Sequence, residues 1–245
     1  MKAMILAAGA GSRLRPLTDT CPKALIDING TPMLEIVLRR LIHAGVNAVV
    51  INVFHLADLI VDFLRAQNHF GIHIEISRET ELLDTGGGLK KAAYFFDDDR
   101  PFILHNVDVL SNLDLQKMYQ YHVAQNALAT LAVQSRQSGR YFLFNANGVL
   151  CGWESMAQQQ KTWASVPVEQ TTRLAFNGIH IISPQIFSKM QETGAFSINQ
   201  IYLRLAGAGE KILAFPMDEY FWRDLGRLEK LEQARQEARA GEIYF

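Results

Sequence analysis

Glycines and cations near the N-terminus have the composition of a phosphate-binding loop. The apolar run from Ala3 to Ala8 ends in Gly9-Ala10-Gly11, so the backbone can leave a buried strand tightly and turn its N–H groups toward an anion. Arg13, Arg15 and Lys23 add full charges, and an arginine can offer two parallel donors to a phosphate where a lysine offers a point charge. The segment therefore predicts a site for a phosphate-rich ligand such as a nucleoside triphosphate.

Two better-known phosphate-binding loops do not fit this segment. The P-loop spacing G-x-x-x-x-G-K-[ST] is absent, and Leu14 stands where the dinucleotide-binding pattern G-x-G-x-x-G requires its third glycine. A P-loop fold and a dinucleotide-binding fold are both disfavoured.

Three further groups of residues could act on such a ligand. Asp108 follows an apolar run, and Asp224 lies between Trp222 and Gly226; the alternative for each is to cap a turn. The glycines of Asp84-Thr85-Gly86-Gly87-Gly88 permit a close approach of main chain to a flat ligand, unless Asp84 or Thr85 simply caps a helix. Asn177-Gly178 interrupts a strand pattern, which marks either a nearby ligand or a bulge.

Composition favours a small-molecule partner. The chain has 245 residues, 49% hydrophobic and 20% charged, with a formal net charge of −1, which argues against non-specific binding of nucleic acid. Cys21 and Cys151 have no C-x-x-C spacing, so neither a disulfide framework nor a zinc site is expected, and a reducing cytoplasm is the expected compartment. The N-terminal apolar run is too short for a membrane span.

Strands and helices that could position these residues alternate along the first half. Helices are expected at 33–44, 58–64 and 89–96, and strands at 3–8, 48–53, 72–76 and 101–104. Such β-α-β alternation implies parallel strands with helices on both faces, where ligands bind beyond the carboxyl ends of the strands. Gly9, Asp84 and Asp108 all follow such ends.

The second half is richer in strands. They are expected at 127–133, 141–144, 149–153 and 173–182, with Asn147-Gly148 as a hairpin turn and 157–172 as a mobile loop. Helices are expected near 184–190, 198–205 and 227–240.

The motifs taken together resemble those of the sugar-1-phosphate nucleotidyltransferases, also called nucleotide-sugar pyrophosphorylases. Residues 6–18 with Pro22-Lys23 are similar to the family signature L-x-x-G-x-G-x-R-L-x-P-x-T…P-K, and the motifs at 84–88, 106–108, 176–179 and 222–226 follow in the family's order. The likeness is greatest to short bacterial members that use N-acetylmuramate 1-phosphate with UTP, or mannose 1-phosphate with GTP. It implies an α/β fold, a Rossmann-like three-layer sandwich with a mostly parallel central sheet and a small mixed β acceptor lobe. We expect a single domain over 1–245, with a nucleotide-binding half at about 1–126 and a sugar-phosphate-binding half at about 127–245.

The resemblance also implies a role for each candidate residue. By this resemblance, Arg13 and Lys23 are expected to be catalytic, and Asp108 and Asp224 are expected to be ligands of one Mg²⁺. We expect sugar hydroxyls to be bound by Glu154, Asn177 and Gly178. Arg173 and Lys161 are candidate phosphate contacts by charge alone. The predicted nucleotide-binding residues are Leu6, Ala7, Ala8, Gly9, Gly11, Ser12, Arg13, Leu83, Asp84, Thr85, Gly86, Gly87 and Asn106.

The implied reaction joins a nucleoside triphosphate, with UTP favoured, to a sugar 1-phosphate, and the enzyme is expected to be a monomer or small homo-oligomer. Two departures from the family pattern leave the acceptor open: Val107 stands where many members have glycine, and Glu-Lys-Pro is missing. The alternatives are guanylyl transfer to mannose 1-phosphate, cytidylyl transfer to a phosphorylated alcohol such as phosphocholine, and a regulatory nucleotide-binding module with weak catalysis.

Overall fold

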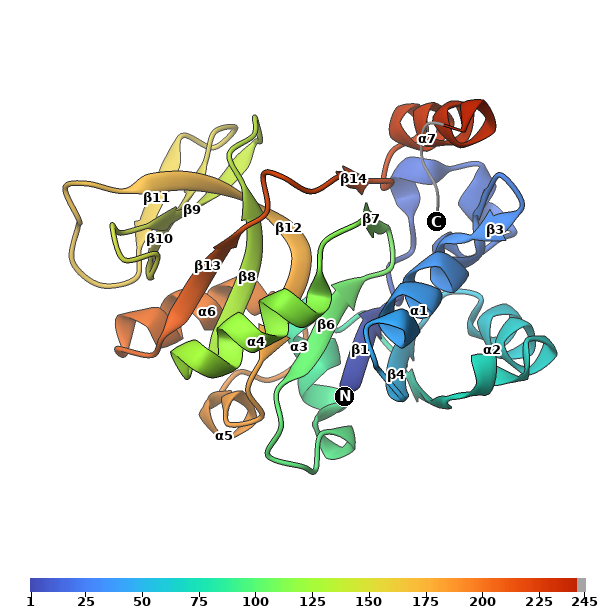
Figure 1. Cartoon of the computed structure of the whole chain (residues 1–245), viewed down its shortest axis with the longest axis horizontal. Helices are drawn as coiled ribbons and strands as arrows, with labels where there is room; N and C mark the ends of the chain where they lie inside the picture. Colours follow the sequence, from blue (N-terminus) through green and yellow to red (C-terminus); the bar gives the residue numbers. More distant parts are fainter. Residues whose placement is uncertain (242–245) are drawn as a thin grey trace. The chain divides into compact units, whose positions relative to one another are not determined.

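A computed structural model describes residues 1–241, which form two compact units (Figure 1). Unit 1 contains residues 1–82, 105–112 and the segment from Phe221 onward, and unit 2 contains residues 83–104 and 113–220. These units differ from the halves expected at 1–126 and 127–245, because the chain passes between them at several points rather than at one.

Unit 1 is built on parallel strands. β1 (Lys2–Leu6) pairs with β4 (Ala48–Val53), and β4 pairs with β5 (His73–Arg78), both in parallel. The connections contain α1 (Met33–His43) and α2 (Ala57–Ala66), the helical crossovers that parallel neighbours need. Helix α1 forms because its apolar residues recur at helical spacing, and that face is buried. The β-α-β prediction is confirmed here.

Short elements complete unit 1. The 3-10 turns are η1 (Ser12–Leu14), η2 (Leu17–Asp19), η3 (Lys23–Leu25) and η4 (Asn68–Gly71). Antiparallel pairs join β2 (Asp27–Ile28) to β3 (Thr31–Pro32) and β7 (Val109–Ser111) to β14 (Trp222–Asp224). Helix α7 (Leu228–Ala240) buries Leu231 and Ala234 in a core that also contains Leu14 and Leu225.

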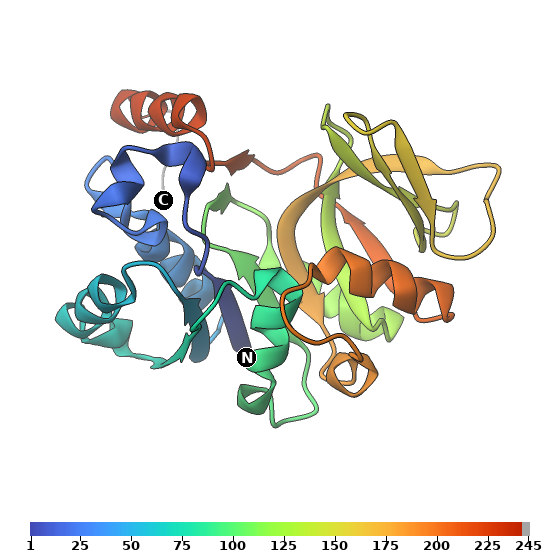
Figure 2. The same ribbon diagram turned by 180° about the vertical axis from the view of Figure 1, so that it is seen from behind.

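Unit 2 contains a mostly antiparallel sheet. Its strands are β8 (Ala129–Gln134), β9 (Arg140–Phe144), β10 (Leu150–Ser155), β11 (Gln160–Trp163), β12 (Thr172–Ile182) and β13 (Ile212–Pro216), of which β13 runs parallel to β8. Helix α4 (Leu115–Gln125) lies in front of this sheet in Figure 1, and α6 (Ile198–Gly207) lies in front of it when the molecule is turned round (Figure 2), so the two helices cover opposite faces. The remaining elements are α3 (Asp84–Lys91), η5 (Ala93–Phe95), α5 (Ile186–Lys189) and β6 (Phe102–Asn106), which ends in unit 1.

The structure corrects three local expectations in unit 2. Helix α3 begins at Asp84 rather than near Leu89, so the glycine run is helical. Strand β11 lies within the segment 157–172 that was expected to be a loop, because it pairs with β10. Helix α4 was not anticipated; its hydrophobic face is interrupted by polar residues, although Asp114 caps it by accepting a hydrogen bond from the Lys117 N–H.

Candidate active site

The glycine loop follows the carboxyl end of β1 in unit 1, where the sequence predicted it. The N–H groups of Gly9, Ala10 and Gly11 have no hydrogen-bond partner within residues 1–241, and a β-carbon on Gly9 would have no atom within 4 Å. Gly11 has φ +65°, and a β-carbon there would lie 2.7 Å from Thr18 Cγ2. Glycine is therefore required at Gly11 by local geometry, and the loop presents donors to solvent.

A short antiparallel pair brings the two predicted aspartates together. Strand β14 pairs with β7 so that Asp224 lies opposite Val109, the residue after Asp108. The Leu225 N–H also donates to the Asp108 carbonyl at 2.8 Å. Two carboxylates that are far apart in the sequence thus lie on one edge of unit 1.

Four charged groups converge near Gly226. A β-carbon on Gly226 would lie 2.9 Å from Asp224 Oδ1, 3.1 Å from Arg13 Nη2 and 3.1 Å from Asp108 Oδ2. Lys23 Nζ forms an ion pair with the same Asp108 oxygen, and the two side chains are only 13% and 15% exposed. The residues that were predicted to be catalytic and metal-binding in unit 1 therefore share one site.

Val107 does not prevent Asp108 from reaching this site. Its side chain is buried, its N–H donates to the Leu6 carbonyl at 3.2 Å, and its φ is not positive. A β-branched residue is compatible with such backbone, so glycine is not needed at this position. Asn106, also in unit 1, accepts a hydrogen bond at its carbonyl from His105 Nδ1 at 2.8 Å.

The two carboxylates fit a hard cation that is shared with a ligand. Residues 1–241 contain no group of three or more His, Cys, Asp or Glu side chains able to hold a metal. Mg²⁺ commonly takes one or two carboxylates and completes its shell with phosphate oxygens and water. Asp108 and Asp224 suit that arrangement, in which Mg²⁺ and the Lys23 ammonium would compete for Asp108 Oδ2.

The crowding around Gly226 predicts a specific loss of activity. We expect Gly226→Ala to lower kcat by roughly 10- to 100-fold, because its β-carbon would displace the Asp224, Arg13 and Asp108 tips, and small misplacements are costly. These atoms end flexible side chains, so the melting temperature should change little. Gly139→Ala is the matched control, since nothing lies within 4 Å of its β-carbon. Wild-type kcat in Gly226→Ala would contradict the proposed site.

In unit 2, the glycines predicted to approach a nucleobase lie close to another segment of the same chain. A β-carbon on Gly86 would lie 2.5 Å from the Phe196 ring, and one on Gly87 would lie 2.5 Å from the Gly194 carbonyl oxygen. The Gly86 and Gly87 N–H groups donate to the Phe196 carbonyl at 2.9 and 3.2 Å. The glycines thus serve helix packing. Of the two capping candidates, Asp84 Oδ1 accepts from the Thr85 N–H at 2.6 Å in the first turn of α3, whereas Thr85 Oγ1 accepts from the Ile198 N–H.

A stability measurement follows from this packing. Gly86→Ala should lower the free energy of unfolding by about 1–3 kcal/mol, the usual cost of overpacking a tight contact. Urea denaturation followed by circular dichroism measures it, with Gly139→Ala in the same unit as control. An unchanged midpoint of the urea transition would contradict this prediction, because it would show that the Phe196 ring can move aside without lowering stability. The nucleobase role of Leu83, Asp84, Thr85, Gly86 and Gly87 stays a prediction.

The predicted acceptor residues also lie in unit 2 and are already engaged by protein groups. Glu154 forms an ion pair with Arg173 at 2.7 Å. Asn177 is buried, accepts from Arg136 Nε at 3.1 Å and donates to Gln134 Oε1 at 3.0 Å. The register of β12 shifts at this point and Gly178 has φ +75°, so the bulge considered from the sequence is present. Lys161 stacks its ammonium over Trp163 at 4.3 Å.

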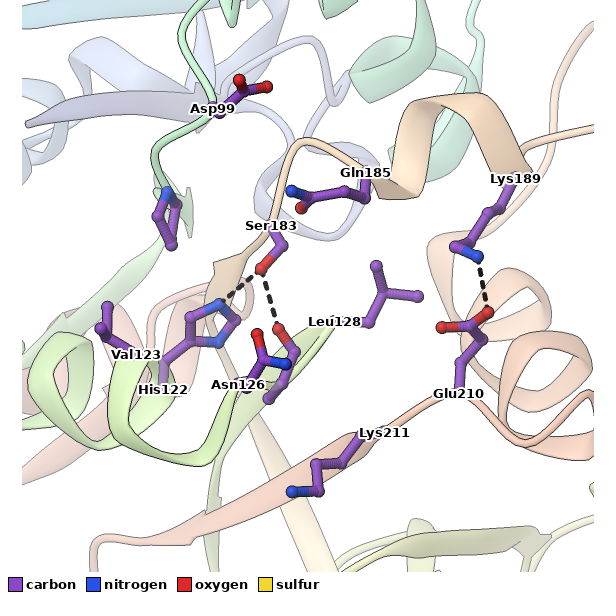
Figure 3. A pocket seen from close by; sticks show the side chains of 12 residues that line it. Asp99, His122, Val123, Asn126, Leu128, Ser183, Gln185, Lys189, Glu210 and Lys211 are labelled. Atoms are coloured by element: carbon purple, nitrogen blue, oxygen red, sulfur yellow. Dashed lines mark hydrogen bonds and ion pairs between the residues drawn. The ribbon is translucent and has the colours of Figure 1, made fainter.

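A cavity of about 400 Å³ in unit 2 contains none of the predicted site residues (Figure 3). His122, buried in its wall, lies 2.9 Å from both Thr130 Oγ1 and Ser183 Oγ. Because Ser183 donates to the Ala127 carbonyl at 2.8 Å, it accepts from His122 Nε2, and Nδ1 accepts from Thr130. Both ring nitrogens are therefore hydrogen-bonded, as in a structural histidine.

Buried histidines predict sensitivity to acid. Burial lowers the pKa of both His105 and His122 from 6.5 to about 4. Between pH 6.5 and pH 4 the unfolded chain binds more protons than the folded chain. The free energy of unfolding is therefore greatest above pH 6.5 and falls as the pH drops toward 4. We expect a loss of about 2 kcal/mol per histidine between pH 7 and pH 5. Urea unfolding at both pH values should show a smaller loss in His122→Gln, and equal losses would contradict this assignment.

Sequence reasoning missed a buried polar pair beneath the glycine loop. Asn52 Oδ1 accepts from the Ala7 N–H at 2.8 Å, and Asn52 Nδ2 donates to Glu79 Oε1 at 2.7 Å. The available signal was Asn52 itself, a polar residue that interrupts the otherwise apolar strand Ala48–Val53.

No helix within residues 1–241 is long and apolar enough to cross a membrane.

Comparison with known proteins extends these observations. A family model described as nucleotidyl transferase matches residues 2–241. The chain is 31% identical to the UTP–glucose-1-phosphate uridylyltransferase of Synechocystis sp., over 96% of this chain and 62% of that protein. It is 30% identical to the mannose-1-phosphate guanyltransferase of Yarrowia lipolytica, over 93% and 61%. The chain thus spans about three fifths of the length of these relatives.

Solved structures share the fold. A Bacillus anthracis protein in complex with sucrose matches with a TM-score of 0.80 and 22% identity, over 100% of this chain and 97% of that chain. HddC from Yersinia pseudotuberculosis, complexed with GMP-PN, matches with a TM-score of 0.77 and 22% identity, over 97% and 99%. The expected α/β class with a mostly parallel central sheet is confirmed.

Proposed function

Since this chain belongs to the nucleotidyl transferase family, we propose that it joins a nucleoside triphosphate to a sugar 1-phosphate, giving a nucleotide sugar and pyrophosphate. The observation that carries this proposal is the convergence of Arg13, Asp108 and Asp224 on Gly226, with Lys23 paired to Asp108. Cations for phosphate and carboxylates for a divalent cation are the groups that nucleotidyl transfer needs.

The acceptor needs no general base in this reaction. The second pKa of a phosphate monoester is about 6, so a sugar 1-phosphate is largely a dianion at neutral pH. One of its oxygens attacks the α-phosphorus, and the bond from that phosphorus to the β-phosphate breaks, its electron pair leaving with pyrophosphate. The obstacle is the approach of two anions, so the enzyme must supply position and opposite charge.

The charged residues of unit 1 divide this work. Arg13 is exposed, with its Nη2 near Gly226, and would bind the triphosphate and neutralise the departing pyrophosphate. Lys23 is placed to contact the phosphate under attack once it leaves Asp108. Asp108 and Asp224 would hold Mg²⁺, which when bound supplies further positive charge at the phosphates.

The preferred substrates are UTP with N-acetylmuramate 1-phosphate or mannose 1-phosphate. The named relatives support UTP or GTP as donors and glucose 1-phosphate or mannose 1-phosphate as acceptors. Glu154 and Asn177 are both bonded to side chains of the protein, so their contacts do not favour one of these sugars over another. Free thiols at Cys21 and Cys151 are compatible with a reducing cytoplasm, which we propose as the compartment. We also propose that the protein acts as a monomer or small homo-oligomer.

A pyrophosphate-release assay tests the proposal. Each nucleoside triphosphate is combined with N-acetylmuramate, mannose and glucose 1-phosphates and with phosphocholine, with and without Mg²⁺. We expect turnover with one sugar 1-phosphate, dependent on Mg²⁺. Turnover only with CTP and phosphocholine would show that the acceptor is a phosphorylated alcohol and not a sugar 1-phosphate. Nucleotide binding without any turnover would favour a regulatory module.

A further inference from the structure

The first amide of the glycine loop is held by a side chain of the neighbouring strand. β1 and β4 run in parallel with Leu6 beside Asn52, and the next amide, the Ala7 N–H, donates to Asn52 Oδ1 at 2.8 Å. Asn52 is only 3% exposed, so water does not readily replace it. This carboxamide therefore helps to set the direction in which the chain leaves the sheet, together with the bond from the Val107 N–H to the Leu6 carbonyl.

A carboxylate fixes the orientation of that carboxamide. Glu79 follows β5, where its N–H donates to the Val53 carbonyl at 2.8 Å, and its Oε1 accepts from Asn52 Nδ2 at 2.7 Å. An ionised carboxylate only accepts and a backbone N–H only donates, so an amide between them satisfies both in one orientation. Glu79 is 7% exposed, and a buried charge of this kind needs such a donor.

We propose that Asn52 and Glu79 are positioning residues for the phosphate loop. Glu79 holds the Asn52 amide in one orientation, Asn52 holds Ala7, and Ala7 sets the direction of the Gly9 to Gly11 N–H groups. This inference rests on the proposed function, because it takes the loop to bind the phosphates of the nucleotide. A shift of about 1 Å at such a site costs as much as 100-fold in rate, so the two buried residues act through the loop without touching substrate.

Exchanging the amide and the acid tests the proposal. Asn52→Asp places a second carboxylate against Glu79, whereas Glu79→Gln keeps an oxygen that can accept from Asn52 Nδ2 but adds an N–H₂ group that can face it as well. The double variant Asn52→Asp/Glu79→Gln restores both hydrogen bonds with reversed roles and unchanged total charge. In it the new amide at position 79 donates, and the new carboxylate at position 52 accepts from both that amide and the Ala7 N–H.

Pyrophosphate binding, measured by calorimetry without turnover, is the readout. We expect Kd for pyrophosphate to rise about 10-fold in Asn52→Asp and less in Glu79→Gln, and to return to within about threefold of wild type in the double variant. KM for the nucleotide should follow the same order. Asn47→Asp is the matched control, because Asn47 is exposed at the opposite end of β4.

A purely structural role gives a different result. It would lower the melting temperature and the folded fraction while leaving Kd of the folded protein unchanged, and that outcome overturns the inference. Failure of the double variant to regain wild-type affinity also overturns it, and this comparison can be made even where Asn52→Asp alone does not fold. Wild-type binding of pyrophosphate without turnover would defeat the proposed function alone, whereas no binding by the wild type would defeat both.

Discussion

Replacing Arg13 or Lys23 by alanine is expected to lower kcat by roughly 100-fold or more, the usual effect of removing a charge aimed at the transition state. Arg13 Nη2 lies beside the Asp108 and Asp224 carboxylates, and Lys23 Nζ is held on Asp108. Both cations therefore lie where the phosphates would meet the metal. The measurement is initial-rate pyrophosphate release at saturating nucleotide.

Arg15 provides the control for these variants. Its side chain is 71% exposed and pairs with Asp19, at 3.3 Å, four residues along the chain. An exposed pair of this kind contributes little, so Arg15→Ala should retain kcat within about twofold. Turnover at the wild-type rate in either Arg13→Ala or Lys23→Ala would remove that residue from the catalytic site.

The second large effect is expected at the two carboxylates. Asp108→Asn and Asp224→Asn should each raise the Mg²⁺ concentration for half-maximal activity by about 10-fold or more, since both oxygens are proposed to serve one ion. The fold should survive, because the Leu225 N–H donates to the Asp108 backbone and an asparagine at position 224 can still accept from the Gly226 N–H.

Metal binding can be separated from turnover in these variants. Mn²⁺ binding followed by electron paramagnetic resonance, in the presence of nucleotide, should weaken in parallel with the Mg²⁺ requirement. Asp27→Asn is a suitable control, because Asp27 is exposed in unit 1 and accepts from the Gly30 N–H. Wild-type Mn²⁺ affinity in Asp108→Asn would show that this carboxylate is not a ligand.

Local patterns in the sequence were enough to predict the β-α-β elements of unit 1. The helix expected at 33–44 is α1, Met33–His43, and the strand expected at 48–53 is β4. Apolar spacing decides such elements because it fixes which face of a helix or strand can be buried. The turn at Gly11 follows from the residue itself, since φ +65° suits glycine.

Local patterns were insufficient where a distant segment determines the conformation. The run Gly86 to Gly88 was expected to precede a helix at 89–96, yet the Phe196 carbonyl accepts from the Gly86 and Gly87 N–H groups and the run lies within the helix. Strand β11 likewise exists because β10 offers it a partner. In both places pairing with another segment overrides the local preference of the residues.

The sequence by itself determined the residue types of the site, namely the glycine loop, Arg13, Lys23 and the two aspartates. Only the tertiary structure decided that β7 and β14 bring Asp108 and Asp224 together, and that Gly226 leaves room for their oxygens. It also decided that Asn52 supports the loop. The residue types of a site can be identified along the sequence. The distance between two side chains depends on long-range strand pairing, which composition and periodicity do not specify.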